Sequence, residues 1–428
     1  MGIAQRRIAA FALSLALAGC GHAAQSVVQP PASHANGFAR GASVKHVVIL
    51  EMENRSFDSF FGTYPGVNGI PSNVTCNPDP QSGQCIYPYH DTSTINYGGP
   101  HGVRATRVDL DGGALDGFVK AAEQKNNLDP DPDEVMGYHT CAEIPTYCQY
   151  ASRYTLADNF FAATSSWSTM AHLFLVSGWS AKCTVPGDPM SCVSNNDINI
   201  KNLPDYPWTD LTWLLHAAGV SWGYYVYDQQ HPMVPGDGDD ERPGPNDGPT
   251  LGGAWNPLPL FDDVKADGQL GDIQSGTNFD AQVAAGTLPV VSWVIPSFNE
   301  SDHPNADLVN GQAWVKHVVD ELQASPQWSS TIVFLQWDEW GGFYDHVVPP
   351  VIDKLGYGFR SPLIIIGPMV KSGHIDHQLL SSDAELKFIE DLFLGSERID
   401  ANDGRPDSRP DVREIEPALG DLRKDLTL

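Results

Sequence analysis

The stretch HVVILEMENRSFD at residues 46–58 indicates the class of fold. Its first part is a continuous run of mainly β-branched apolar side chains, which is typical of a strand buried on both faces, as in a parallel sheet. The run stops at charged and amide residues. In open α/β sheets, functional side chains lie just beyond the carboxyl ends of the strands. We therefore expect Glu53 and Asn54 at a functional edge, where their oxygens suit a divalent cation; the alternative is a strand end followed by a polar turn.

Further apolar runs alternate with stretches of helical spacing along the chain. This alternation predicts a doubly wound α/β sandwich. Segments rich in Gly, Pro and Asp between the runs predict loop insertions, and from residue 396 we expect a polar, peripheral tail. The predicted strands lie at residues 220–227, 287–295, 331–337 and 361–367, and the predicted helices at 169–177, 210–218, 313–323 and 384–395.

Polar side chains follow two of the other predicted strands directly. Asp338 and Glu339 come at the end of an apolar run, where two adjacent acids are unfavourable unless a cationic group compensates them. A solvent-exposed turn would account for them, but a metal shared with the carboxylate after the first strand accounts for them better. His303 follows another strand, so we expect it at the same edge of the sheet.

A serine lies where a predicted helix begins. Ser168 precedes the apolar segment 169–177, and the amides and dipole at a helix N-terminus favour negative charge, including an alkoxide or a bound phosphate. The alternative is that Ser168 is only an N-cap. Together with a metal and histidines, such a serine has the groups needed for metal-assisted nucleophilic attack on phosphorus.

The charge balance limits the class of partner. Among 428 residues, 25 are Lys or Arg and 53 are Asp or Glu, which gives a formal net charge of −28. Such a surface repels nucleic acid and offers no broad attraction to anionic lipid. We therefore expect no nucleic-acid partner, and an anionic substrate requires a metal or a few local cationic groups.

The cysteines suggest an oxidising compartment. Of the seven cysteines, six fall into three close pairs, and an even number in an exported chain suggests disulfides. Pairing between neighbours is the simplest arrangement, although other connectivities remain open. A zinc site is less expected, because no Cys-x2-Cys spacing occurs. The pairs are Cys76 with Cys85, Cys141 with Cys148, and Cys183 with Cys192.

The N-terminus has the pattern of an export signal. Residues 1–19 have a charged start and an apolar middle, and the apolar run is shorter than the about 20 residues that span a bilayer. The sequence LAGC at its end resembles a bacterial lipoprotein box, which implies cleavage before Cys20, acylation of that thiol and a membrane tether; cleavage after Ala24 is the alternative. Residues 20–43 are a predicted flexible tether, and residues 44–428 a single domain. We expect an exported protein, either a periplasmic or cell-surface lipoprotein or a secreted one.

Two motifs resemble those of a known family. The sequences ENRSFD at residues 53–58 and DEWGGFYDHV at residues 338–347 resemble signatures of the bacterial phosphoesterase family that includes phospholipases C and a class of acid phosphatases. The resemblance extends from about residue 44 to 395. It implies an alkaline-phosphatase-like fold, with a doubly wound, mostly parallel sheet flanked by helices. Weaker matches lie at residues 113–118, 302–304 and 386–390.

The resemblance also implies roles for individual residues. One divalent metal would bind the oxygens that follow two strands, and such oxygens favour Ca²⁺, Mg²⁺ or Mn²⁺. A serine nucleophile would pass through a phosphoserine intermediate, and histidines would contact the phosphoryl group. The implied metal ligands are Glu53, Asn54, Asp338 and Glu339; the nucleophile is Ser168; the histidines are His303 and His346, with His101 a weaker match.

The chain departs from the family pattern around its nucleophile. The family segment has Gly-Pro before the Ser or Thr and Pro-Asn shortly after it, whereas this chain has SWSTMAH at residues 166–172. Thr169 is therefore a second choice of nucleophile. The segment 381–383 also lacks the usual Asp-His-Thr. We expect a metal-dependent hydrolase of phosphate esters, phospholipids among them, of phospholipase C type; an acid phosphatase is the alternative, and a catalytically silent, ligand-binding surface lipoprotein is a more remote one.

Overall fold

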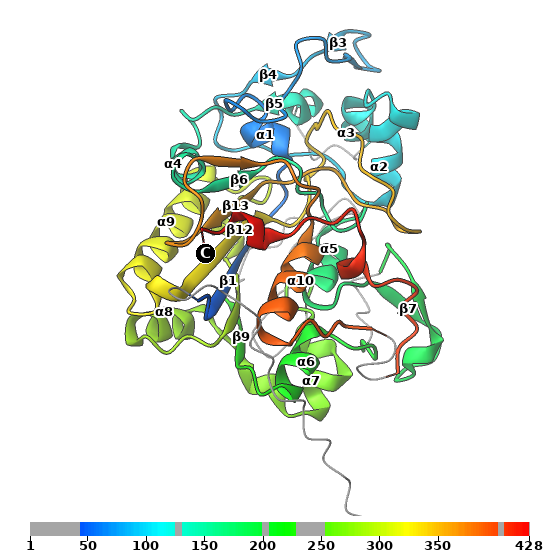
Figure 1. Cartoon of the computed structure of the whole chain (residues 1–428). Coiled ribbons are helices and arrows are strands. Elements are labelled where there is room, and N and C mark those ends of the chain that lie inside the picture. Colours follow the sequence, from blue (N-terminus) through cyan, green and yellow to red (C-terminus); the bar gives the residue numbers. More distant parts are fainter. Residues whose placement is uncertain (1–42, 125–130, 199–204, 228–252, 401–405, 428) are drawn as a thin grey trace, which may run out of the picture. The chain divides into compact units, whose positions relative to one another are not determined.

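A computed structural model describes residues 43–124, 131–198, 205–227, 253–400 and 406–427 (Figure 1). These residues belong to one compact unit that runs from residue 33 to residue 428. The predicted signal peptide, Cys20 and all but the last residue of the predicted tether lie outside the described residues. Within the described residues, no helix is both long enough and apolar enough to cross a membrane.

The centre of this unit is an eight-stranded sheet with the order β10-β9-β11-β1-β12-β13-β6-β14. Neighbouring strands are parallel except at β13, which runs antiparallel to both β12 and β6. The prediction of an α/β fold with a mostly parallel sheet is confirmed. The strands are β1 (His46–Met52), β6 (Thr155–Ala157), β9 (Trp222–Val226), β10 (Ile273–Ser275), β11 (Val291–Ile295), β12 (Thr331–Trp337), β13 (Leu363–Ile366) and β14 (His374–Asp376).

Strand β1 lies between two parallel neighbours, so three carboxyl ends meet. Leu50 pairs with Val294 of β11, and Met52 pairs with Trp337 of β12. The backbone contacts continue past the strands: the amide of Glu53 donates to the carbonyl of Ser301 at 2.8 Å, and the amide of Asp338 donates to the carbonyl of Met52 at 3.0 Å. The pairing of β1 therefore gathers the polar loops after all three strands at one edge.

Helices cover both faces of the sheet (Figure 1). Val47 and Ile49 of β1 belong to one apolar core and Val48 to another, because successive side chains of a strand point to opposite faces. The core around Val47 includes residues of the first four helices below, and the core around Val48 includes residues of the last four. These helices are α5 (Ser168–Ser177), α6 (Leu211–Ala217), α7 (Asp262–Ala266) and α10 (Ser382–Phe393), and α1 (Phe57–Phe61), α4 (Pro145–Arg153), α8 (Gly276–Ala285) and α9 (Leu308–Ala324).

The loop insertions carry short elements and three disulfides. A third apolar cluster contains Phe118 and Val119 of α3 with Trp340. Each disulfide joins the nearest cysteine along the chain, so the simplest predicted pairing is confirmed. The short elements are α2 (Val103–Leu110), α3 (Phe118–Gln124), β2 (Asn77–Pro78), β3 (Cys85–Ile86), β4 (Tyr89–His90), β5 (Gly137–Tyr138), β7 (Ala181–Cys183) and β8 (Cys192–Ser194). The disulfides are Cys76–Cys85, Cys141–Cys148 and Cys183–Cys192.

Two local expectations differ from the structure. Helix α9 begins at Leu308, five residues before the predicted start at residue 313, because the Asp307 side chain accepts a hydrogen bond from the amide of Val309 at 3.0 Å and caps the first turn. Helix α2 was not predicted, since Arg104 and Arg107 interrupt its few apolar residues and leave no wide apolar stripe.

The expectation of a peripheral tail was wrong. Arg409 and Arg413 of the described tail are buried. The guanidinium of Arg409 donates to the carbonyl of Ser177, the last residue of α5, at 2.8 Å. The guanidinium of Arg413 lies 4.4 Å from the ring centroid of Phe174, also in α5. The polar tail is thus packed because its arginines reach backbone and aromatic groups of the helix that begins at Ser168.

Candidate active site

The residues after β1 and β12 are held together by a backbone contact. Asn54 has a φ of 58°, a left-handed conformation that Asn adopts more readily than most residues. Its amide donates to Oδ1 of Asp338 at 2.8 Å. Gly341 has a φ of 62°, and a Cβ there would lie 2.3 Å from the Asn54 carbonyl oxygen. Glycine is therefore required where this loop approaches the end of β1.

Glu53 joins a hydroxyl and an imidazole. Oγ of Ser168 donates to Oε2 of Glu53 at 2.9 Å, and Nε2 of His172 lies 2.9 Å from Oε1 of the same carboxylate. Ser168 is the first residue of α5, whereas Trp167 is the N-cap residue. The hydroxyl of Ser168 is thus directed at Glu53, and the N-cap alternative for this serine does not hold.

His172 was not predicted from the sequence. It lies one helical turn after Ser168 and therefore on the same face of α5. Its side chain is fully buried, and burial lowers the pKa of His172 to about 3. The imidazole is therefore neutral, with one ring nitrogen available as an acceptor or ligand. The spacing of four residues between Ser168 and His172 was the signal that could have revealed it.

Carboxylates are concentrated at this edge of the sheet. Glu53, Asp338 and Glu339 are all buried, and Oε2 of Glu339 accepts from the amide of Gly341 at 2.7 Å. Burial, with the nearby charges of Asp338 and Glu385, raises the pKa of Glu51 well above its usual range. Burial beside other carboxylates thus disfavours a further negative charge at this edge, and a cation bound there would relieve that penalty.

The donor set fits a divalent cation. Glu53, His172 and Asp338 each offer one ligand atom, and these atoms lie within 4.8 Å of one another. Asn54 and Glu339 supply further oxygens beside them. Buried carboxylates of this kind are stabilised when they coordinate a metal, so the predicted metal ligands and the serine are brought to one place. Their roles remain predictions.

His101 lies against the same group. Its Nδ1 is 2.7 Å from the carbonyl oxygen of Gly99, which can only accept, so the proton is on Nδ1. Nε2 then accepts from Nδ2 of Asn54 at 3.1 Å and lies 3.8 Å from Oε1 of Glu339. The structure therefore brings His101 next to two of the predicted metal ligands.

His303 lies beside Trp255, an aromatic residue that also neighbours His172. Its Nδ1 donates to the carbonyl oxygen of Pro304 at 3.0 Å. The ring centroid of Trp255 lies 5.9 Å from that of His303 and 6.4 Å from that of His172. The neighbouring Asp302 is buried, and burial raises its pKa to about 7. The indole of Trp255 is thus a neighbour of both His303 and His172, and it is the imidazole of His172 that contacts Glu53.

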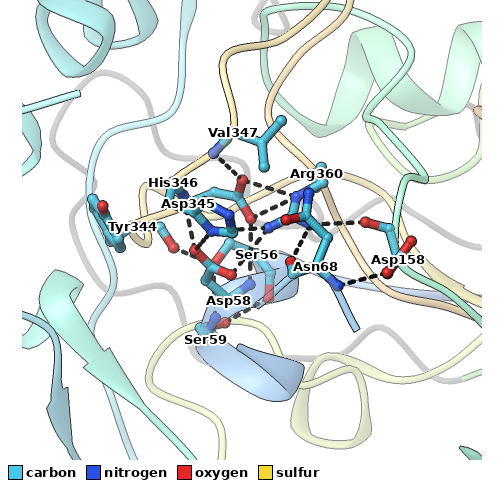
Figure 2. Close-up of polar contacts among 10 residues, drawn as sticks. All are labelled: Ser56, Asp58, Ser59, Asn68, Asp158, Tyr344, Asp345, His346, Val347 and Arg360. Carbon is cyan, nitrogen blue, oxygen red and sulfur yellow. Dashed lines mark hydrogen bonds and ion pairs between the residues drawn. The ribbon is translucent and has the colours of Figure 1, made fainter. Parts of the chain in front are cut away.

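His346 belongs to a buried ionic cluster, which Figure 2 shows. Its Nδ1 lies 2.6 Å from Oδ2 of Asp58, and its amide donates to the same oxygen at 2.8 Å. Arg360 donates to Oδ1 of Asp58 at 3.0 Å and to Oδ1 of Asp345 at 3.0 Å. Burial raises the pKa of Asp345 to about 6 even though Arg360 opposes the shift. Arg360 compensates the negative charge of Asp58 and Asp345, so this cluster is an ion-pair network. The polar contacts described for His346 lie within this network.

A cavity of about 630 Å³ opens beside the start of helix α5. It is lined by Pro100 and Gly102, which flank His101, and by Trp167, which precedes Ser168. Arg104 and Arg107 of α2 also line it, which places local positive charge next to the site in a strongly acidic chain. The volume suits a small-molecule ligand.

Residues 44–394 match the Phosphoesterase family, and the chain belongs to this family. The match covers both signature motifs and all the predicted site residues. The family recognised from those motifs is thereby confirmed.

Curated relatives of the chain carry phospholipase names. It is 27% identical over 420 residues to "Non-hemolytic phospholipase C" of Pseudomonas aeruginosa, covering 86% of this chain and 56% of the relative. It is 26% identical over 400 residues to "Phospholipase C B" of Mycobacterium tuberculosis, covering 82% and 73%. It is 25% identical over 370 residues to "Non-specific phospholipase C6" of Arabidopsis thaliana, covering 78% and 63%. The chain thus spans between about half and three quarters of the length of these relatives.

Two solved structures show a partial likeness to the chain. A phosphonate monoester hydrolase of Agrobacterium radiobacter aligns with a TM-score of 0.37 and 11% identity, over 81% of this chain and 73% of that one. A protein in the alkaline phosphatase superfamily from Vibrio parahaemolyticus aligns with a TM-score of 0.35 and 14% identity, over 82% and 66%.

Proposed function

We propose that the protein is a metal-dependent hydrolase of phosphate esters, of phospholipase C type, with Ser168 as its nucleophile. The observation that carries the proposal is the contact of Glu53 with the hydroxyl of Ser168, while Asp338 lies within metal-ligand reach of the same carboxylate. An activated oxygen nucleophile needs a serine whose hydroxyl is hydrogen-bonded to a carboxylate within a buried group of potential metal ligands.

The proposed metal is held by Glu53, Asn54, Asp338 and Glu339. When bound, a divalent ion neutralises phosphoryl oxygens and lowers the pKa of a nearby hydroxyl. The structure supports this assignment through the chemistry of the donors, which combine buried carboxylates with an amide at the ends of two paired strands.

The proposed reaction has two halves. In the first, Oγ of Ser168 attacks phosphorus, its proton passes to Glu53, and the bond from phosphorus to the leaving oxygen breaks. His346 or His303 donates a proton to that oxygen as a general acid. In the second, water attacks the phosphoserine and gives its proton to that histidine, the bond from phosphorus to Oγ breaks, and Glu53 returns its proton to Oγ, which regenerates the hydroxyl.

Phosphodiesters are the preferred class of substrate, and phosphomonoesters are the alternative. The phospholipase names of the relatives favour a diester. The cavity with Arg104 and Arg107 supports binding of an anionic ester next to Ser168. We also propose that the chain is exported and tethered through Cys20, a proposal supported by the three disulfides.

The test compares a serine variant with its neighbour. Ser168→Ala removes the attacking oxygen, and we expect the rate of nitrophenol release to fall by about 10³-fold or more. Thr169→Val is the comparison variant, because Thr169 is the second choice of nucleophile and its hydroxyl makes no hydrogen bond with any of the described residues. We expect this variant to stay within about threefold of the parent.

The choice of substrates in this test distinguishes a phospholipase C-type enzyme from an acid phosphatase. Nitrophenyl phosphate and nitrophenyl phosphocholine are compared on the parent protein at saturating Mn²⁺. Faster cleavage of the diester supports a phospholipase C-type activity. A large preference for the monoester would instead indicate an acid phosphatase. A parent protein without turnover on either ester contradicts the proposal and favours a ligand-binding lipoprotein.

A further inference from the structure

We infer that His172 is a ligand of the metal, so that the site is a mixed nitrogen and oxygen site that favours a first-row transition ion over Ca²⁺ or Mg²⁺. The inference rests on the proposed function, since it concerns the same metal. It adds a residue that neither the signature motifs nor the expected all-oxygen set contains.

The spacing of the donor atoms carries the inference. Two ligands about 2.1 Å from one ion, at about 90–110° to each other, lie about 3.0–3.4 Å apart. Nε2 of His172 is 2.9 Å from Oε1 of Glu53. Donor atoms of Glu53, His172 and Asp338 are all within 4.8 Å of one another, a spread that small side-chain movements bring within reach of one ion.

The position of His172 on α5 is suited to this role. It lies one turn after Ser168, and both side chains reach Glu53. Helix α5 is held at its far end by Arg409, which donates to the carbonyl of Ser177 at 2.8 Å. The helix therefore presents the nucleophile and the imidazole to the same carboxylate as a fixed pair.

The surroundings of the ring resemble the outer support of a metal-bound histidine. Nδ1 of His172 lies 3.5 Å from the Tyr224 hydroxyl, which in turn donates to the carbonyl of Trp255 at 2.6 Å. The indole of Trp255 lies nearly parallel to the imidazole, at an interplanar angle of 11°. A hydrogen-bonding group at the second nitrogen and a packed ring face orient an imidazole toward a metal.

A hydrogen bond to Glu53 is the competing role for His172. In that case the imidazole would only orient the carboxylate, and the ion would be bound by oxygens alone. The two roles differ in metal preference, because imidazole favours transition ions whereas carboxylate and amide oxygens suit Ca²⁺ and Mg²⁺. They also differ in whether a histidine nitrogen is bonded to the ion.

The spectroscopic test uses full-length protein labelled with ¹⁵N-histidine and loaded with Mn²⁺. Pulsed electron paramagnetic resonance detects a nitrogen bonded directly to Mn²⁺, and we expect that coupling in the parent. His172→Gln is expected to abolish it, because the amide still donates to Glu53 but has no imidazole nitrogen. His317→Gln is the control, since Asp280, His317 and Glu321 form a surface group that could hold an adventitious ion. This control should keep the coupling.

The binding test measures Mn²⁺ and Ca²⁺ affinity of the same proteins by calorimetry. For His172→Gln we expect the Kd for Mn²⁺ to rise by at least about tenfold and the Kd for Ca²⁺ to change by less than about threefold. Absence of the nitrogen coupling in the parent overturns the inference, whether or not the variant folds. So does a coupling that persists in His172→Gln. In both cases loss of activity on chelation would still support the proposed function, whereas activity that survives chelation would contradict that function itself.

Discussion

At the scale of single residues, the site depends on which atoms each carboxylate contacts. Glu53 contacts Ser168 and His172, whereas Asp58 contacts His346 and Arg360. The two carboxylates lie five residues apart, yet they support different histidines. Each carboxylate faces one nitrogen of its histidine, and a contact of this kind selects the tautomer of the imidazole.

Asp58 is expected to position His346. In Asp58→Asn the side-chain amide can present a donor to Nδ1 of His346, which changes the tautomer, and we expect kcat to fall by about 10²-fold with little change in KM. Steady-state kinetics with a phosphodiester would measure both. Asp345→Asn is the matched control, because it also removes a carboxylate partner of Arg360, whereas the hydrogen bond to Nδ1 of His346 comes from Asp58. Equal losses of kcat in the two variants would contradict a positioning role.

Asp302 is expected to make stability depend on pH. Burial raises its folded-state pKa to about 7, whereas an unfolded Asp titrates near about 3.9. Between these values the folded state holds one proton more, so stability falls as pH rises through this window. Replacement by Asn removes the effect. We expect the free energy of unfolding of Asp302→Asn, relative to the parent, to rise by about 2–3 kcal/mol between pH 5 and pH 8.

Urea unfolding at several pH values would measure this difference. Asp267→Asn serves as the control for the loss of a surface carboxylate, since Asp267 is exposed. A difference for Asp302→Asn that is constant from pH 5 to pH 8 would rule out titration of this buried carboxyl.

At the scale of elements, the C-terminal tail supports helix α5. Arg413 donates to both carboxylate oxygens of Asp353, at 2.8 and 2.9 Å, and its guanidinium also covers Phe174. It bonds to the carbonyl of Ala163, in the segment that leads into the helix. The tail therefore restrains the turn before Ser168 as well as the helix itself.

Loss of Arg413 should destabilise the protein strongly. In Arg413→Met the carboxylate of Asp353 loses its partner, and we expect the free energy of unfolding to fall by about 3–5 kcal/mol. Lys424→Met is the control in the same tail, because Lys424 is exposed and its ammonium donates to Oε1 of Gln378 at 3.0 Å. This change should cost less than about 1 kcal/mol. Thermal unfolding of both variants would check the contrast, and equal losses would mean that the tail does not support the fold.

At the scale of the whole molecule, a strongly acidic chain concentrates buried acids at one edge of its sheet. The formal net charge is −28, and Glu53, Asp338 and Glu339 are buried together. A cation bound there would stabilise the folded state, because it binds that state and not the unfolded chain.

Removal of divalent ions should therefore lower both activity and stability. We expect a chelator to abolish ester hydrolysis and to lower the Tm by several degrees, and added Mn²⁺ to restore both. Calorimetric scans before and after chelation would measure the shift. Asp338→Asn is the comparison variant, in which the chelator should change the Tm much less. An unchanged Tm and full activity after chelation would contradict a metal at this site.

Much of the fold could be predicted because it depends on local pattern. The apolar runs that became β1, β11 and β12 and the periodic segments that became α5, α6 and α10 are recognisable along the chain. Their order is sufficient to predict parallel strands whose polar ends meet, and hence the neighbourhood of Glu53, Asn54 and Asp338. Short elements such as β6, β10 and β14 have only three residues each, too few to show a period.

The sequence by itself thus determined the α/β class and the residues at the strand ends, whereas it left the disulfide connectivity open until the structure paired each cysteine with its neighbour. Only the tertiary structure revealed that His172 reaches Glu53, that Arg360 joins Asp58 to Asp345, and that the tail packs on α5. Most of these contacts join residues that lie 119 to 302 positions apart in the chain, and the others depend on how the elements pack. Periodicity determines which face of an element is apolar, but the polar partner of a buried side chain is decided only when the elements pack.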